Sequence, residues 1–221
     1  MDKELEHSVK AATLELKEEP MKDYYDNLIA GYPSRLRVRK VLKELGDVKG
    51  KRVLDIGCEE GYVSFKIIKK EPAELYAMDI IQEALDTYRE NLSKIKTDTK
   101  VFTKRAFLQK MPFKSDFFDA AVCTEVIEHA PHIEKGFKEM ARVLKKGGRL
   151  VITFPNEPLR RIVYPIVKML GVNTDVEKDV TLFDRDPKHI LTLLAEDFDI
   201  KKFYRFPFYF PMTNMVVCVK R

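Results

Sequence analysis

The sequence Lys51-Arg-Val-Leu-Asp-Ile-Gly-Cys-Glu-Glu-Gly-Tyr62 is a short apolar run that breaks into a glycine-containing turn and then into a helical pattern. Val53, Leu54 and Ile56 predict a strand that is buried on both faces, which is typical of a parallel sheet covered by helices. Open sheets of this kind bind nucleotide-like ligands at the carboxyl ends of their strands. We therefore expect an α/β fold with a ligand site at this turn.

The turn itself reads Asp55-x-Gly57-x-Glu59-x-Gly61, whereas the dinucleotide-binding fingerprint is Gly-x-Gly-x-x-Gly. Two acids at the turn would repel a pyrophosphate, which is bound by exposed N–H groups and a positive local potential. Glycines at the turn let the backbone approach a ligand closely. A cationic ligand suits this turn better than a phosphate, although an ordinary α/β turn is the alternative interpretation.

This segment resembles motif I of the class I S-adenosylmethionine-dependent methyltransferases, usually Asp/Glu-x-Gly-x-Gly-x-Gly. Their ligand carries an ammonium and a sulfonium. The resemblance implies that the cofactor is bound by the following residues of the turn: Asp55, Gly57, Cys58 and Gly61. Glu59 replaces the middle glycine of the motif. If this position requires a positive φ, Glu59 costs about 1 kcal/mol or more and would weaken cofactor binding.

The composition fits one large domain with appendages, because the chain has 221 residues and 45% hydrophobic content. No run approaches the ~18 apolar residues of a membrane span, and the charged N-terminus lacks a signal-peptide core. We therefore expect a cytoplasmic protein. The net charge of +5 is mild and only weakly indicates nucleic acid. Three widely spaced cysteines, Cys58, Cys123 and Cys218, predict buried reduced thiols.

Residues 1–46 predict a helical N-terminal arm and cap, with patterns over 2–19, 21–30 and 33–45 and a stop at Gly46. Residues 47–221 would form the methyltransferase domain. Related methyltransferases have an aromatic-acid segment and a Pro-x-Arg that close over the methionine end of the cofactor. The resemblance implies these roles for Tyr25 and Arg35. The alternative is a solvated helix whose tyrosines pack on the core.

A second strand, residues 74–78, ends in Asp79, eighteen positions beyond Gly61. An acid about 20 residues after the glycine turn, at the tip of the adjacent strand, can accept hydrogen bonds from both hydroxyls of a ribose. The next residue, Ile80, is positioned to flank an adenine ring. The alternative role for Asp79 is capping the helix predicted over residues 81–92.

The third predicted strand, residues 100–103, leads into a segment where the family has an acid that contacts the adenine amino group. Arg105 takes the place of that acid here. Met111-Pro112-Phe113 matches the family's Leu-Pro-Phe. We therefore expect the backbone of Ala106 and Phe107 to contact the adenine.

The fourth strand, residues 120–123, is followed by Thr124-Glu-Val-Ile-Glu-His-Ala-Pro-His132. In a helix, Glu125, Glu128 and His129 would share one face. The segment resembles the methyl-proximal loop of ubiquinone-type O-methyltransferases. It also resembles the metal-binding Glu-x-x-Glu-His of small-RNA 2′-O-methyltransferases, which requires a further ligand such as His132 or His189. A purely structural role is the third interpretation, and our prediction includes no metal.

Methyl transfer from a sulfonium depends mainly on positioning the nucleophile, the methyl carbon and the sulfur nearly in line. A hydroxyl acceptor also needs a base, and histidine is suited to that role. His129 is our first candidate and His132 the second, with Glu125 beside the transferred methyl group. An amine or carboxylate acceptor would need no dedicated base.

The run Arg142-Val-Leu-Lys-Lys-Gly-Gly-Arg-Leu-Val-Ile152 resembles the family's Leu-x-Pro-Gly-Gly-x-Leu. We expect a helix over 133–144, stopped by residues 145–148, and a fifth strand over 149–154. A substrate-side insertion follows at about 157–186, whose apolar stripe packs on the domain or lies on a membrane. A helix over 187–195 and strands over 198–203 and 215–219 complete the chain.

The resemblance implies a Rossmann-like seven-stranded mixed sheet, order 3-2-1-4-5-7-6, with helices on both faces. It implies methyl transfer from S-adenosylmethionine, and we expect a hydroxyl on a small or lipid-like molecule as the acceptor. RNA is the runner-up acceptor. The alternative from a different functional class is a catalytically silent scaffold, a protein that keeps the fold without the activity, since Glu59 and Arg105 depart from the family's pattern.

Overall fold

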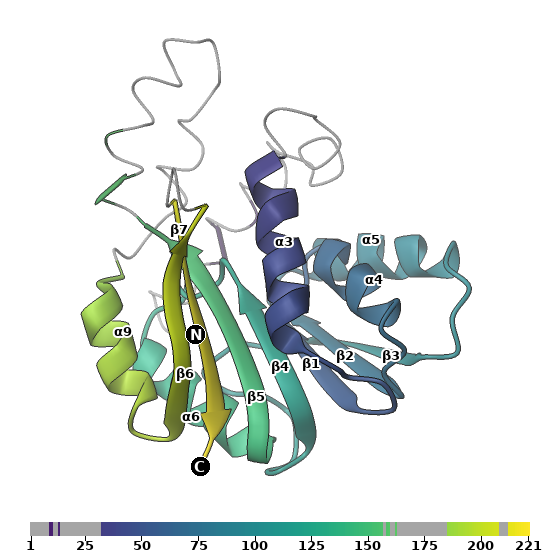
Figure 1. Ribbon diagram of the computed structural model, residues 1–221. Coiled ribbons are helices and arrows are strands. Elements are labelled where there is room, and N and C mark those ends of the chain that lie inside the picture. Colours follow the sequence, from purple (N-terminus) through teal and green to yellow (C-terminus); the bar gives the residue numbers. More distant parts are fainter. Residues whose placement is uncertain are drawn as a thin grey trace.

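The computed structural model describes residues 9–10, 13, 32–156, 158–159, 162, 185–207 and 212–221. Seven strands and five helices follow one another along this part of the chain, and no helix separates β3 from β4 or β6 from β7 (Figure 1). The strands are β1 (Arg52–Ile56), β2 (Glu74–Asp79), β3 (Lys100–Arg105), β4 (Phe118–Thr124), β5 (Leu144–Pro155), β6 (Phe198–Phe206) and β7 (Thr213–Lys220). The helices are α3 (Tyr32–Leu45), α4 (Tyr62–Ile68), α5 (Gln82–Ser93), α6 (Ile133–Val143) and α9 (Pro187–Leu194).

The strands form one sheet in the order β3-β2-β1-β4-β5-β7-β6, which confirms the predicted topology. β1 pairs in parallel with β2 on one side and with β4 on the other, and β7 is antiparallel to both of its neighbours. The register places Asp55 opposite both Ala77 of β2 and Val122 of β4. The carboxyl ends of β1, β2 and β4 therefore meet at one edge of the sheet.

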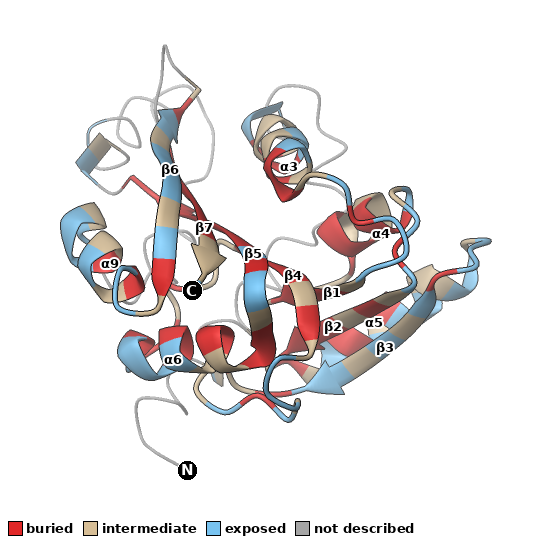
Figure 2. Cartoon of the chain, turned by 60° about the horizontal axis from the view of Figure 1, so that its bottom comes forward, coloured by how far each residue is buried: buried red, intermediate tan, exposed pale blue. Residues whose placement is uncertain are grey.

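Helices cover both faces of the sheet, as predicted. Val53 of β1 packs with α3 and α4 on one face, whereas its neighbour Leu54 packs with α6 and α9 on the other. Successive residues of a strand point to opposite faces, so this double burial explains why β1 is apolar at consecutive positions. Burial is concentrated on the central strands, and the edge strands β3 and β6 carry much of the exposed surface (Figure 2).

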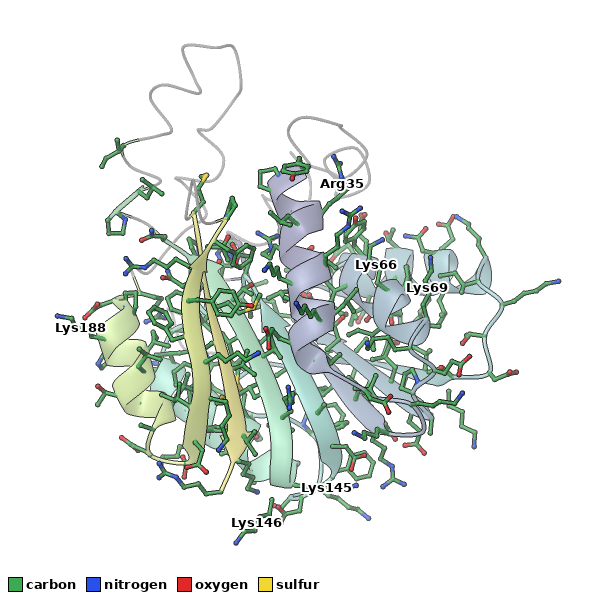
Figure 3. All side chains as sticks on the ribbon, viewed as in Figure 1. Arg35, Lys66, Lys69, Lys145, Lys146 and Lys188 are labelled. Atoms are coloured by element: carbon green, nitrogen blue, oxygen red, sulfur yellow. The ribbon has the colours of Figure 1, made fainter. Side chains whose placement is uncertain are left out.

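The helix predicted over 133–144 is confirmed to within one residue, but residues 145–148, which we expected to form its stop, belong to β5. Helix α6 ends at Val143, and Leu144 already has extended backbone and pairs with Phe118 of β4. The Lys145 ammonium bonds the Asp119 carboxylate of β4 at 2.5 Å. Residues 145–148 lie in the irregularity between the Phe118–Leu144 and Ala120–Arg149 pairs, where this ion pair ties them to β4. Lys145 and Lys146 lie at the end of the molecule opposite Arg35 (Figure 3).

Helix α3 confirms the helix predicted over residues 33–45, and Gly46 follows it with a φ of 76°. The patterns over 2–19 and 21–30, the proposed lid residue Tyr25 and most of the 157–186 insertion lie outside the described residues. All three cysteines are buried free thiols, as expected. In the described part of the chain, no helix combines the length and apolarity that crossing a membrane requires.

Candidate active site

The two glycines of the turn are required by its geometry. Gly57 has a φ of 70°, and a β-carbon there would lie 2.2 Å from Cγ2 of Val126 in the loop after β4. Gly61 has a φ of 100°, and its β-carbon would lie 2.3 Å from the ring of Phe65 in α4. Both positions favour glycine by backbone conformation and by space. The turn thus lies tightly against the β4 loop and the first turn of α4.

Glu59, which replaces the motif's middle glycine, has a φ of 46°. This positive φ is the case for which we expected strain at Glu59. A non-glycine residue in this region costs on the order of 1–2 kcal/mol. Its N–H donates to Oδ2 of Asp79 at 2.9 Å. Glu125 across the site also has a positive φ, of 54°. Strained backbone of this kind is concentrated at ligand and catalytic sites.

Asp55 lies beneath the turn and is fully buried. Its Oδ2 accepts a 2.6 Å hydrogen bond from the Ser64 hydroxyl of α4, while Oδ1 is buried without a hydrogen-bond partner. Burial raises the pKa of Asp55 to about 7, and the negative charge of Asp79 acts in the same direction. An orphaned carboxylate oxygen at the turn is consistent with a site that accommodates a cationic ligand.

Asp79 is at the tip of β2, 7% exposed, and faces the turn. Its carboxylate accepts the N–H of Glu59 and the N–H of Ile81, each at 2.9 Å. Burial raises its pKa. The N-cap of α5 is Ile81, so Asp79 is not the capping residue of that helix. Each of its oxygens has a further lone pair, which keeps the carboxylate competent to accept hydroxyl groups.

The predicted adenine edge is arranged differently from our expectation at Ala106. The N–H of Ala106 already donates to the Asp79 carbonyl at 2.9 Å, because β3 continues its pairing with β2 up to Arg105. The Arg105 guanidinium donates to the carbonyl of Ile80 at 3.0 Å. Phe107 forms an isolated bridge with Lys110 in the following turn. Arg105 therefore binds backbone at this edge, where the family has an acid.

A small cavity lies between the glycine turn and the end of β4, with a volume of about 30 Å³. It is lined by Arg37, Gly57, Cys58, Glu59, Tyr62, Val63, Thr124 and Glu125. The guanidinium of Arg37 lies 3.2 Å from Glu125 Oε2, and both side chains are about 15% exposed. Arg35 and Asp79 are not among the lining residues. The sequence analysis missed Arg37, because it matched the family's Pro-x-Arg to Arg35, two positions earlier in the chain.

The segment after β4 is not helical, so the shared face predicted for Glu125, Glu128 and His129 is wrong. Glu125 takes a left-handed conformation, and a tight turn follows in which the His129 N–H donates to the Val126 carbonyl at 3.0 Å. Glu125 lines the cavity, whereas Glu128 is buried at 2% exposure. His129 Nε2 lies 3.9 Å from Glu128 Oε1.

The other two candidate histidines lie farther along the chain. His132 is the exposed N-cap of α6, with a φ of 49°. His189 is on α9, 4.0 Å from Glu134. Within the described ranges, no three His, Cys, Asp or Glu side chains form a group that could hold a metal ion. The structure therefore does not assemble the Glu125, Glu128 and His129 ligand set.

A larger cavity, of about 340 Å³, opens at the carboxyl end of β5 and the adjacent amino end of β7. Its described lining residues are Pro155, Asn156, Pro158, Arg185, Asp186, Pro187 and Asn214. Arg185 also holds the turn after β4, since its guanidinium donates to the carbonyls of Ile127 and Ala130. This cavity is thus joined through one side chain to the loop that carries Glu125 and His129, and its size is within the range of small-molecule sites.

Three comparisons identify the class. Residues 47–201 match the family model described as a methyltransferase domain. A ubiquinone biosynthesis O-methyltransferase of Vibrio cholerae is 28% identical over 166 residues, covering 72% of this chain and 65% of that protein. The structure of the N-methyltransferase NodS of Bradyrhizobium japonicum with S-adenosylhomocysteine has a TM-score of 0.69 at 14% identity, covering 97% and 98% of the two chains. That of the [4+2]-cyclase SpnF has a TM-score of 0.72 at 14% identity, covering 98% and 93%.

The chain belongs to the methyltransferase-domain family, and its fold is that of the class I S-adenosylmethionine-dependent methyltransferases. It spans about 65% of the length of the Vibrio relative. The residues present fit the cofactor of this class. Gly57 lines the small cavity with its backbone, Asp79 offers acceptors for hydroxyls, and Glu59 and Glu125 line the place of a cationic tail.

Proposed function

We propose that this protein transfers the methyl group of S-adenosylmethionine to an oxygen of a small or lipid-like acceptor. The observation that carries the proposal is the placement of the acidic glycine turn and its cavity beside a second, larger cavity across the β4 loop. The Vibrio relative supports oxygen as the acceptor atom, because its name specifies O-methylation in ubiquinone biosynthesis. The fold alone does not choose the atom, since NodS is an N-methyltransferase and SpnF a cyclase.

The cofactor, when bound, supplies a methyl group that is already activated by a positive sulfur. The residues of the chain position the cofactor and the acceptor. Asp79 accepts the ribose hydroxyls, the turn from Asp55 to Gly61 holds the amino-acid end, and Ile80, Ala106 and Phe107 border the adenine. Glu125 and the turn after β4 form the wall on the methyl side. Tyr25 and Arg35 remain our proposed lid residues over the methionine end.

His129 is the base that we propose for a hydroxyl acceptor, with His132 as the second candidate. Two placements support this order. The His129 side chain is only 18% exposed, and its Nε2 lies 3.9 Å from the buried Glu128 carboxylate. His132 is an exposed helix cap. Arg185 fixes the carbonyls on either side of the Glu128–His129 pair, so the imidazole is presented from a rigid turn.

The experiment has two steps. Calorimetry with S-adenosylhomocysteine tests the cofactor site, and we expect saturable binding in the micromolar range. Transfer of labelled methyl from S-adenosylmethionine is then measured to catechols with and without a long alkyl tail. His129→Asn should abolish transfer while His132→Asn retains it. Absence of binding would support a silent scaffold, and transfer to RNA with a steep salt dependence would favour the nucleic-acid alternative.

A further inference from the structure

The tight turn after β4 is held by side chains from two distant segments of the chain. The Arg185 guanidinium, just before α9, donates to the carbonyl of Ile127 at 2.9 Å and to the carbonyl of Ala130. The side-chain amide of Gln109, in the connection between β3 and β4, donates to the carbonyl of Pro131 at 2.5 Å. Three carbonyls of one short turn are thus bound by groups from outside it.

These external bonds matter because the turn belongs to no regular element. Strand β4 ends at Thr124, and helix α6 begins at Ile133. Inside the turn, the N–H of Ala130 lies 3.4 Å from the carbonyl of Ile127, which is longer than the usual range of about 2.7–3.2 Å. The side chains that reach in from other segments therefore contribute strongly to the shape of the turn.

Gln109 extends from a segment that is itself anchored to α6. The N–H of Met111 donates to the Glu139 carboxylate of that helix at 2.7 Å. The Arg142 guanidinium, also on α6, donates to the carbonyl of Met111 at 2.9 Å. The Gln109 amide is therefore presented from a fixed support.

The two supports come from opposite sides of the site. Gln109 follows Phe107, which we propose to border the adenine, whereas Arg185 lines the larger cavity, where the acceptor would lie. We propose that Arg185 and Gln109 are positioning residues, which together hold the turn so that the His129 imidazole is placed at the acceptor hydroxyl. This inference rests on the proposed function, and it assigns the placement of the base to two residues outside the recognised motifs.

The chemistry of Arg185 suits this role in two ways. The planar fork of a guanidinium spans two carbonyls at once, which a lysine ammonium matches less well. Glu128, beside His129, is buried at 2% exposure, and a buried carboxylate requires compensation. Burial lowers the pKa of Arg185, and the negative charges of Glu128 and Glu134 oppose this change. The guanidinium thus binds the turn and balances the charge beneath it.

The test uses two acceptors that differ in their need for a base. Catechol must lose a proton during transfer, whereas 4-nitrocatechol is largely ionised at slightly alkaline pH. We expect Arg185→Met and Gln109→Met each to lower kcat for catechol by about tenfold to 100-fold, since small displacements of a catalytic group have effects of this size. With ionised 4-nitrocatechol the loss should be about threefold or less, because the base is bypassed.

Two measurements need no acceptor. Calorimetry should give an affinity for S-adenosylhomocysteine within about twofold of the wild-type value in both variants, since neither residue lines the small cavity. Amide hydrogen exchange over residues 126–131, followed by mass spectrometry, should quicken in both variants.

Matched variants provide the controls. Lys188→Met removes a charge from an exposed position of α9 that points away from the molecule, and it should leave kcat unchanged (Figure 3). Arg185→Lys keeps a cationic donor and should recover part of the loss. Urea unfolding of each variant ensures that folded proteins are compared.

Three results would overturn the proposal while the enzyme assignment stands. They are equal losses with both catechols, full activity of Arg185→Met and Gln109→Met with catechol, and unchanged exchange over residues 126–131. If the wild-type protein binds no S-adenosylhomocysteine and transfers no methyl group, the proposed function itself fails, and this inference falls with it.

Discussion

The conformation of Glu59 gives the first prediction at the residue scale. A glutamate with a φ of 46° is strained, and a glycine at this position would relieve the strain. Glycine also raises the entropy of the unfolded chain, but this destabilising effect is smaller than the strain that is relieved. We expect Glu59→Gly to raise the free energy of unfolding by roughly 0.5–1 kcal/mol and to tighten binding of S-adenosylhomocysteine. Urea unfolding and calorimetry measure the two effects.

Glu60 is the matched control, because it is the neighbouring glutamate and is not among the residues with positive φ. Glu60→Gly should lower stability by about 0.5–1 kcal/mol, the ordinary cost of added backbone freedom. If both substitutions destabilise the protein equally, the strain assigned to Glu59 is absent in solution.

Asp55 predicts a pH dependence of stability. Burial raises its folded pKa to about 7, against about 3.9 in an unfolded chain. Between these values the folded state binds the proton and the unfolded state does not, so stability falls as pH rises from about 4 to about 7. The loss from this group is at most about 4 kcal/mol.

Asp55→Asn keeps the shape of the side chain and removes the titration. The unfolding free energy of the wild type minus that of this variant should therefore be smaller at pH 8 than at pH 4. Urea titrations at the two pH values measure it. A difference that stays constant with pH would show that Asp55 ionises normally and is hydrated in solution.

At the scale of elements, the turn after β1 and the loop after β4 behave as one packed unit. A β-carbon at Gly57 would overlap Cγ2 of Val126 at 2.2 Å, and its φ of 70° adds backbone strain. We expect Gly57→Ala to destabilise the protein by about 2–4 kcal/mol. Val126→Ala removes the overlapping methyl group, so the double variant Gly57→Ala/Val126→Ala should lose less than the sum of the single variants.

A coupling energy of about 1 kcal/mol or more from this double-mutant cycle, measured by urea unfolding, would show the direct contact. Strict additivity would contradict the packing. Ile190→Ala in α9 provides a control cavity, since Ile190 is buried and α9 packs against β6 and α6, away from the turn. It should add independently to Gly57→Ala.

The elements differ in how far the sequence determines them. Val53, Leu54 and Ile56 identify β1 because burial on both faces demands consecutive apolar residues. The segment 145–148 was misassigned, because its lysines and glycines have the composition of a helix end, while its real partner, Asp119, is distant in sequence. Strand pairing and ion pairs across elements are tertiary effects that local pattern does not contain.

The candidate site, too, could be predicted from the sequence only in part. Asp79 and the glycines were predictable, since a fixed spacing places them at the tips of adjacent strands. Arg37 was not, because its partner Glu125 reaches it only through a left-handed backbone conformation. A helical spacing was assumed for Glu125, Glu128 and His129, whereas the chain bends at Glu125. Positive φ at a glutamate has no reliable signal in a single sequence.

At the scale of the whole molecule, the three thiols report on global opening of the fold. Cys58, Cys123 and Cys218 are 3%, 0% and 0% exposed, and each lies in or beside the central sheet. Burial raises the pKa of all three, that of Cys218 to about 12, so the reactive thiolate is scarce in the folded protein.

We therefore expect Ellman's reagent at neutral pH to modify none of the three thiols rapidly in the native protein and all three in guanidinium. Cys123 and Cys218 should react at the rate of global unfolding, because they pair within the sheet on β4 and β7. Cys58 lines the small cavity, so local movement of the turn exposes it first, and saturating S-adenosylhomocysteine should slow its reaction. A thiol other than Cys58 that reacts rapidly in the native state would contradict the assignment of Cys123 and Cys218 to the closed core.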